Sequence, residues 1–191
     1  MVIYKFYVIY VFFKVIDCYL SLLDEWDKQL GGNSIFLAAI DNNVGFTEYA
    51  KNIQTRQLTL ETKYLFCPMH INKNHWVMVV VDIKEKSLNY FDSMKGSGAD
   101  QLNYVRDCLN IILPQIEWSK SVMSETVVDF PLQKKNTTEC GIFLMMYADY
   151  FLANLEMDFS LEDMPKFRIK IFTDLVRNSL NYTMLSHHAT A

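Results

Sequence analysis

The sequence predicts an α+β fold in which a central mixed sheet is flanked by helices and follows an N-terminal helical subdomain. Two adjoining β-rich runs in the middle of the chain, with helical periodicity before and after them, support this prediction. A chain of 191 residues suffices for one domain with a substantial core, and no repeat or Pro/Gly-rich linker divides it. We therefore expect one domain over residues 1–191, with residues 1–9 as an atypical start and 181–191 as a frayed tail.

The N-terminal part is expected to be mainly helical. Apolar residues recur at helical spacing from Val15 to Leu23, and Gly31-Gly32-Asn33 breaks this pattern. Ser34–Ala39 is expected to form a second helix that ends before Asp41-Asn42-Asn43. The mixed pattern of Thr47–Leu60 fits either a helix or a loop.

The middle of the chain carries the clearest β signal. Tyr64–Cys67 is expected to be a short strand closed by Pro68. Trp76–Ile83 is β-branched and apolar on both faces, which is typical of a central strand. Lys84–Ser87 then forms a charged turn, and Leu88–Phe91 returns as the hairpin partner.

After the hairpin, the spacing of apolar residues predicts three helices and one further strand. The first helix is Gln101–Leu113, which Pro114 ends. The strand is Val127–Phe130, and the helix Ile142–Leu155 that follows is apolar enough to be buried. The last helix is Lys166–Leu180, with Pro165 in its first turn.

Composition excludes several classes of protein. Hydrophobic residues make up 51% and aromatic residues 14% of the chain, which argues against disorder. A net charge of −4 argues against nucleic acid as the main partner. The four cysteines (Cys18, Cys67, Cys108 and Cys140) form no CxxC pair, so we expect free thiols in a reducing compartment, the nucleus or the cytoplasm.

The first 23 residues are apolar and aromatic, which raises the question of a membrane or signal segment. Lys5, Lys14 and Asp17 interrupt the run and leave Phe6–Phe13 as its longest uncharged piece. A spanning helix needs about 20 apolar residues, and no small-residue cleavage site follows. We expect no membrane association.

Cys140 stands where a polar run ends and an apolar helix begins. Thr137 and Thr138 are good helix-capping residues, which would place Cys140 in the first turn. The unpaired N–H groups and the dipole at a helix N-terminus favour a thiolate. The structural alternative is a small buried hydrophobic residue, the usual role of a free cysteine.

A cysteine nucleophile needs a base, and the chain has four histidines. His187 and His188 lie in the tail, so the base would be His70 or His75. Cys67, His70 and His75 are close enough in sequence to suggest zinc, but no second ligand pair exists, and we predict no metal.

His75 begins the central strand, and Asp92 ends its hairpin partner, so both lie at one edge of the sheet. Symmetric pairing about Glu85 would set Asp92 opposite Met78, three residues inside His75, so a bulge or bend is needed to bring them together. Asp92 would then orient the imidazole. The alternative is a surface histidine beside a turn aspartate.

Gln133 supplies a candidate for the remaining part of such a site. Attack on a carbonyl creates an oxyanion, which the Gln133 side-chain amide and the backbone N–H of Cys140 are placed to stabilise. His75, Asp92, Gln133 and Cys140 together provide a base, an orienting group, an oxyanion donor and a nucleophile.

This order and its surroundings resemble the ubiquitin-like-protein-specific (SUMO or sentrin) cysteine proteases, which have an adenain-like, papain-related fold. The similarity spans about residues 10–180. The matching pieces are Pro68-x-x-x-Asn72-x-x-His75-Trp76, Tyr90-Phe91-Asp92-Ser93, Pro131-x-Gln133, Asn136-x-x-x-Cys140-Gly141 and Tyr147-Ala148-Asp149.

The resemblance implies that His75, Asp92 and Cys140 form the family's triad and that Gln133 is its oxyanion glutamine. It implies that Trp76 covers a narrow tunnel for the modifier's Gly-Gly tail, with Tyr10 in place of a second tunnel tryptophan. The implied function is a cofactor-free, monomeric thiol peptidase or isopeptidase that cleaves after Gly-Gly of a ubiquitin-like modifier, with SUMO expected, during deconjugation or precursor processing.

Three departures from the family pattern keep two alternatives open. Lys134 and Lys135 separate Gln133 from Asn136 where the family has one residue, and Glu139 replaces an aspartate. The family's Trp-Leu-Asn-Asp start is absent. The chain is then either a truncated or mobile-element-derived, catalytically impaired binder of a modifier, or an active protease on a different modifier.

Overall fold

The computed structural model describes the backbone of residues 2–41, 51, 57–72, 74–125, 131–134 and 137–180. Side chains are described over the same ranges except for residues 2–12, 40 and 41.

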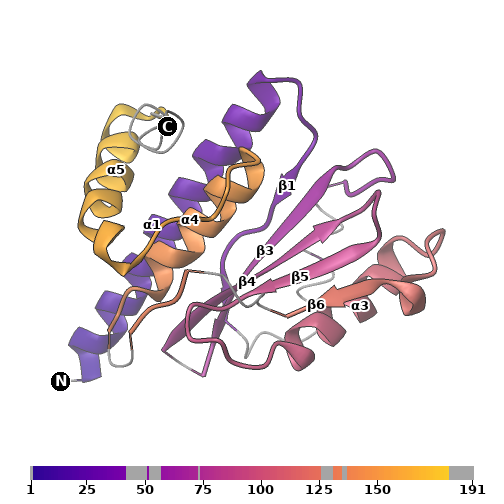
Figure 1. The fold of residues 1–191 in the computed structure, drawn as a ribbon, viewed down its shortest axis with the longest axis horizontal. Helices are drawn as coiled ribbons and strands as arrows, with labels where there is room; N and C mark the ends of the chain where they lie inside the picture. Colours follow the sequence, from indigo (N-terminus) through magenta and orange to yellow (C-terminus); the bar gives the residue numbers. More distant parts are fainter. Residues whose placement is uncertain are drawn as a thin grey trace.

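A mixed sheet forms the centre of the fold (Figure 1). Within the described residues it has six strands in the order β1-β3-β4-β5-β6, and β2 also pairs with β3. The β3–β4 and β4–β5 pairs are antiparallel, whereas β1, β2 and β6 pair in parallel with their neighbours. The strands are β1 (Ile35–Phe36), β2 (Ile40–Asp41), β3 (Tyr64–Ile71), β4 (His75–Asp82), β5 (Ser87–Phe91) and β6 (Val122–Ser124).

Helices cover both faces of the sheet, which confirms the predicted α+β class (Figure 1). Helices α1, α4 and α5 pack on one face, and α3 with the short helix η1 packs on the other. Their bounds are α1 (Val2–Gln29), α3 (Ala99–Ile112), η1 (Trp118–Lys120), α4 (Cys140–Leu152), η2 (Leu161–Asp163) and α5 (Met164–Arg177).

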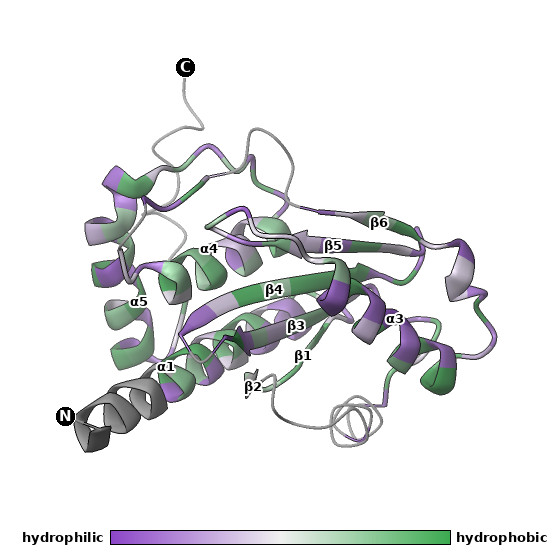
Figure 2. Cartoon of the chain, turned by 90° about the horizontal axis from the view of Figure 1, so that it is seen from below, coloured by the Kyte–Doolittle hydropathy of each residue, from purple (hydrophilic) through white to green (hydrophobic). Residues whose placement is uncertain are grey.

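Strand β4 divides the core into two parts because its side chains alternate between the faces. Trp76, Met78 and Val80 belong to the cluster under α4. Val77 and Val79, with Val81, belong to the cluster under α3. The predicted central strand is therefore correct, and Figure 2 shows its hydrophobic colouring along almost its whole length.

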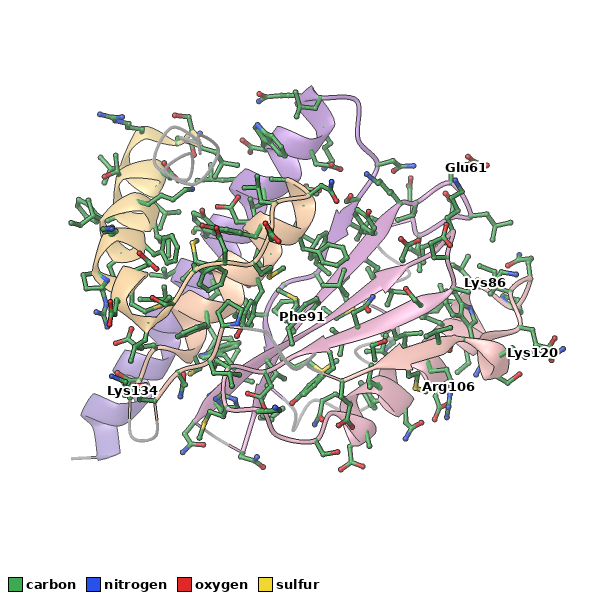
Figure 3. All side chains as sticks on the ribbon, in the orientation of Figure 1. Glu61, Lys86, Phe91, Arg106, Lys120 and Lys134 are labelled. Atoms are coloured by element: carbon green, nitrogen blue, oxygen red, sulfur yellow. The ribbon has the colours of Figure 1, made fainter. Side chains whose placement is uncertain are left out.

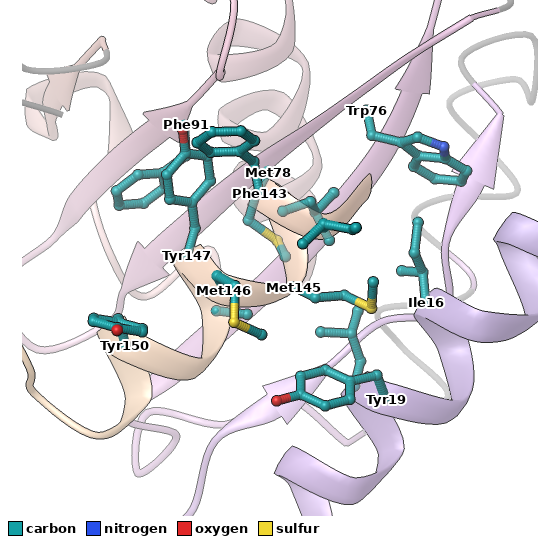
Figure 4. Close-up of a cluster of buried hydrophobic side chains, with 14 of the residues drawn as sticks. Ile16, Tyr19, Trp76, Met78, Phe91, Phe143, Met145, Met146, Tyr147 and Tyr150 are labelled. Carbon is teal, nitrogen blue, oxygen red and sulfur yellow. The ribbon is translucent and has the colours of Figure 1, made fainter. Parts of the chain in front are cut away.

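Helix α4 is buried almost all round, as its uninterrupted apolar sequence predicts. Figure 4 shows Met145 of α4 pointing toward Ile16 and Tyr19 of α1. The ring of Phe143 lies 5.9 Å from that of Phe159, in the segment after α4. Figure 3 places Phe91 of β5 in the interior, where its ring lies 5.7 Å from that of Tyr147. Burying a large apolar side chain contributes about 1.5–3 kcal/mol, so the buried side chains of α4 together determine where the helix lies.

Helix α1 is longer than the predicted Val15–Leu23 segment and runs from Val2 to Gln29. Its buried positions Ile16, Tyr19 and Leu23 follow the expected helical spacing and face α4. Across the part of the chain that the structure describes, no helix is both long and apolar enough to cross a membrane.

The prediction of a helix over Ser34–Ala39 is wrong. Ile35 and Phe36 form β1 beside Leu65 and Phe66, and β2 follows at Ile40. The segment is too short for a clear periodicity, and parallel pairing with β3 satisfies its backbone instead. Most of Thr47–Leu60, and all of Val127–Phe130 and 181–191, lie outside the described residues.

Strand β3 continues through Pro68 to Ile71, so the predicted end at Cys67 is also wrong. Strands β1 and β2 pair with residues 65–66 and 69–70, and Pro68 falls in the gap between them. Proline has no backbone N–H to donate. Because neither β1 nor β2 pairs with residue 68, the missing donor costs no hydrogen bond on that side of β3. The sequence prediction also missed β6, a short edge strand beside β5.

A buried cluster of charges joins the three helices on the α4 side. The Lys170 ammonium of α5 donates to Tyr19 Oη (2.8 Å), Asp149 Oδ2 (3.1 Å) and Asp174 Oδ2 (2.7 Å). All four of these residues are buried, with at most 1% of their surface exposed. The lysine therefore offsets two carboxylates that have no access to solvent, and it ties α5 to α1 and α4.

We predict that Lys170→Ala lowers the free energy of unfolding by about 3–5 kcal/mol, because it leaves two buried carboxylates without their cation. Urea unfolding followed by circular dichroism measures this change. The control is Lys166→Ala on the same helix, where an exposed pair with Asp163 (3.6 Å) should contribute less than about 1 kcal/mol. Equal losses for the two variants would contradict the prediction.

Candidate active site

His75 and Asp92 meet at the end of the β4–β5 hairpin. The register differs by one residue from symmetric pairing about Glu85, because Met78 pairs with Phe91 rather than with Asp92. The β4–β5 pairing runs from Met78 to Asp82 and ends before His75, the position where a bulge or bend was expected. His75 Nε2 lies 2.6 Å from Asp92 Oδ1, which is a short, charge-assisted hydrogen bond.

The loop after β5 holds the Asp92 carboxylate in place. The backbone N–H of Met94 donates to Oδ1 (2.7 Å), and that of Gly96 donates to Oδ2 (2.9 Å). The Tyr90 hydroxyl adds a long contact to Oδ2 (3.4 Å). The carboxylate therefore has several donors and is 2% exposed, so it cannot turn away from His75.

The charges of this pair reinforce each other. Burial lowers the pKa of His75, but hydrogen bonds to Asp92 and Cys140 and the charges on both outweigh it and raise the pKa to about 9. Burial raises the pKa of Asp92, but the His75 hydrogen bond and the Met94 N–H outweigh it and hold the pKa below its ordinary value. Asp92 is thus ionised and His75 is protonated at neutral pH.

Cys140 is the first residue of α4, and its side chain is hydrogen-bonded to His75. Because Nε2 of His75 is directed to Asp92, Nδ1 is the ring nitrogen left for the sulfur. The predicted caps Thr137 and Thr138 are wrong: Glu139 is the N-cap residue, without a side-chain cap. An imidazolium and a helix N-terminus both stabilise a thiolate at this position.

Gln133 lies on a loop fixed at two points. Its backbone N–H donates to Ser93 O (2.9 Å), and its Oε1 accepts from Ser93 Oγ (3.1 Å). The Tyr147 hydroxyl of α4 donates to the carbonyl of Pro131. Among the described residues, Gln133 Nε2 makes one long contact, to Thr137 O (3.4 Å), which uses one of its two N–H groups.

Trp76 is next to His75 on β4 and is 5% exposed. Its ring lies 4.5 Å from that of Phe13 on α1 and 4.7 Å from that of His70 on β3. His70 thus packs against Trp76, and His75 is the one of these two histidines whose hydrogen bond with Cys140 the structure gives. Tyr10 lies in α1, but its side chain is outside the described residues.

The zinc alternative fails on the geometry of β3. Cys67 belongs to the cluster under α3, whereas His70 contacts Phe13 and Trp76 on the opposite face. Among the described residues, no group of three or more histidines, cysteines and carboxylates is arranged to hold a metal ion.

Sequence reasoning brought together His75, Asp92 and Cys140 but missed the groups that orient them. Ser93 and Gly96 lie one and four residues after Asp92, and their contacts depend on how that loop folds back. Arg168 of α5 contacts Glu139 from 29 residues away, and no sequence pattern indicates this pairing. Ser93 and Tyr147 belong to the motifs quoted above, which is the one signal that pointed to them.

We predict that Gly96→Ala disturbs the His75–Asp92 pair. A Cβ at Gly96 would lie 2.8 Å from Asp92 Oδ2, so the carboxylate has to move. The pKa of His75 should then fall by about one unit or more from its value of about 9, as measured by NMR titration of the histidine ring. Ser119→Ala, an exposed change outside this loop, is the control; an unchanged His75 titration in the glycine variant would refute the prediction.

Comparison with known proteins gives one consistent result. Residues 19–180 match the model of the Ulp1 protease family, C-terminal catalytic domain. The chain is 28% identical over 179 residues to Sentrin-specific protease 2 of Pongo abelii, covering 87% of this chain and 30% of that protein. It is 30% identical over 181 residues to Ubiquitin-like-specific protease ESD4 of Arabidopsis thaliana, covering 86% of this chain and 37% of that protein. The chain thus spans well under half the length of these relatives.

Solved structures show the same fold. The C-terminal Ulp1 protease domain in complex with Smt3, the yeast ortholog of SUMO, matches with a TM-score of 0.72 at 17% identity, covering 86% of this chain and 75% of that one. The Chaetomium thermophilum Ulp1-like SUMO protease catalytic domain matches with a TM-score of 0.70 at 15% identity, covering 86% and 71%. Since the family model covers most of the chain, the chain belongs to the Ulp1 protease family, within its C-terminal catalytic domain.

Proposed function

We propose that this chain is a cysteine peptidase that cleaves after the Gly-Gly end of a ubiquitin-like modifier of the SUMO type. The observation that carries the proposal is the hydrogen-bonded series Cys140–His75–Asp92 at the end of the sheet. The names of the relatives, sentrin-specific and ubiquitin-like-specific proteases, support the choice of modifier. We infer that residues 1–191 form a single catalytic domain.

In this proposal Cys140 and His75 rest as a thiolate and an imidazolium. The thiolate attacks the carbonyl carbon of the terminal glycine and forms a C–S bond, while the carbonyl oxygen becomes an oxyanion. The imidazolium then donates its proton to the departing amine, and the C–N bond breaks. Neutral His75 takes a proton from water, whose oxygen attacks the thioester and breaks its C–S bond. The Cys140 thiolate and the imidazolium are restored, and the terminal glycine leaves as a carboxylic acid that gives its proton to solvent.

Gln133 and the backbone N–H of Cys140 stabilise the oxyanion in this scheme. The hydrogen bonds from Ser93 and Tyr147 support this role, because they fix the loop on which Gln133 lies. The available Nε2–H then has a defined direction. Preorganised donors of this kind avoid the cost of reorienting during the reaction.

Trp76 is proposed as the cover over the substrate tail, with Tyr10 as a second wall. The contacts of Trp76 with Phe13 and His70 support a ring held in one position. A flat ring fixed over the tail would admit glycine and exclude larger side chains. The proposed partners are the modifier and its conjugates, the proposed state is a monomer without cofactor, and the proposed compartment is the nucleus or the cytoplasm.

The paired triad argues against the alternative of a modifier-binding domain without activity. His75 and Asp92 are both nearly buried and share a 2.6 Å hydrogen bond, as an active triad requires. A site that had lost its activity would not need this geometry. The second alternative, an active protease on a different modifier, keeps the same chemistry and changes only the substrate.

We predict that turnover of an amide-linked substrate declines as pH rises above about 9, because His75 loses the proton that the leaving amine requires. Alkylation of Cys140 by iodoacetamide should continue above that pH, since the thiolate remains. The raised pKa of His75 also implies stability that is full below pH 6.5 and lost as pH rises through about 9. Parallel decline of alkylation and turnover would contradict this assignment.

The proposed function predicts covalent capture of a modifier. SUMO, ubiquitin and other ubiquitin-like modifiers carrying a C-terminal electrophile are incubated with the protein, and the adduct is located by mass spectrometry. We expect an adduct on Cys140 with the SUMO probe and none with Cys140→Ala. Cys18→Ala, which removes an exposed thiol, is the matched control and should retain the adduct. If the folded protein reacts with none of the probes, the proposed peptidase activity is wrong. If it reacts only with a probe other than SUMO, the activity stands and the proposed modifier is wrong.

A further inference from the structure

The residue before Cys140 carries a negative charge that is paired with a distant arginine. Nη2 of Arg168 on α5 donates to both carboxylate oxygens of Glu139, at 2.6 Å each. The Glu139 side chain is 14% exposed and the Arg168 side chain 52% exposed, so the carboxylate is the more enclosed partner. A carboxylate in this position has little water around it and depends on the guanidinium for its partner.

The Glu139–Arg168 ion pair lies at the helix end that carries Cys140. Glu139 is the N-cap residue of α4, and its carbonyl accepts the N–H groups of Ile142 and Phe143. Glu139 also directly precedes Cys140, so its carboxylate, which is held by Arg168, is carried by the residue next to the thiol at this helix end. Two negative charges at one helix N-terminus oppose each other, so an unpaired Glu139 would disfavour the Cys140 thiolate.

The groups around Cys140 can be counted for the described residues. His75 of β4 contacts the sulfur directly, and Asp92 acts on it through His75. Glu139 precedes it on the N-cap, and Arg168 reaches Glu139 from α5. Without the arginine, these groups contribute two carboxylates against one imidazolium; with it, the charges around the sulfur balance.

We propose that Arg168 is a positioning residue for Cys140, which neutralises Glu139 and holds the N-cap so that the thiolate remains the favoured form. This inference rests on the proposed cysteine peptidase function and adds a residue to its machinery. The guanidinium contacts the Glu139 carboxylate, so Arg168 acts on the sulfur through Glu139. The buried Lys170 links α5 to Asp149 of α4, so the helix that carries Arg168 is itself fixed against α4.

The test is the pH dependence of Cys140 alkylation by iodoacetamide, followed by mass spectrometry of the Cys140 peptide in the full chain. Arg168→Gln should shift the midpoint of the profile upward by about half a pH unit or more, which slows alkylation about threefold below the midpoint. Arg168→Lys keeps the charge and should remain close to wild type. Arg177→Gln, a change of an exposed arginine on the same helix, is the control and should leave the profile unchanged.

Removing the carboxylate separates a charge effect from a structural one. Glu139→Gln should move the midpoint downward, because Arg168 is then uncompensated, and Glu139→Gln with Arg168→Gln should return close to wild type. An unshifted profile in Arg168→Gln, or a shift that persists in the double variant, overturns the proposal. If Arg168→Gln does not fold, an upward shift in Glu139→Gln overturns it instead. Iodoacetamide needs no substrate, so this outcome is independent of the modifier-adduct experiment.

Discussion

Helix α4 is buried against the sheet on one side and against α1 and α5 on the other, and this apolar contact determines where its first residue lies. A helix with side chains in contact on nearly every face cannot move along its axis without opening cavities, at a cost of several kcal/mol. Cys140 is the first residue of that helix, and His75 is the first residue of β4, the strand it packs against. The position of the thiol beside the imidazole is therefore a result of core packing.

Electrostatics then gives this position its chemistry. Asp92 is fixed by backbone N–H groups of its own loop, His75 is protonated between Asp92 and Cys140, and the pKa of His75 rises to about 9 as a result. On the other side of the sulfur, Arg168 pairs with Glu139. The charges thus alternate from Asp92 to His75 to a Cys140 thiolate, and Arg168 of α5 offsets the carboxylate of Glu139 at the same helix end. A change at any one of them alters the protonation of its neighbours.

The extra residue between Gln133 and Asn136 raises the question of whether Gln133, the proposed oxyanion donor, is displaced. Two contacts with Ser93 act at Gln133 itself, and the Tyr147 hydroxyl holds the carbonyl of Pro131. The two anchored residues, Pro131 and Gln133, precede the insertion along the chain, which supports the proposed role of Gln133. This is also why a loop can lengthen while its functional residue stays in place.

The sequence by itself determined the elements with a strong pattern, namely the doubly buried strand β4 and the apolar helix α4, and it determined the order His75, Asp92, Cys140. It did so because hydrophobic periodicity reports burial directly. Only the tertiary structure decided the rest: the strand at Ile35, the one-residue register of the hairpin, and the partners Ser93 and Arg168. A short segment has no period to measure, and turn geometry sets the register. A polar partner is selected by which chain segments packing brings together, and no local pattern records that choice.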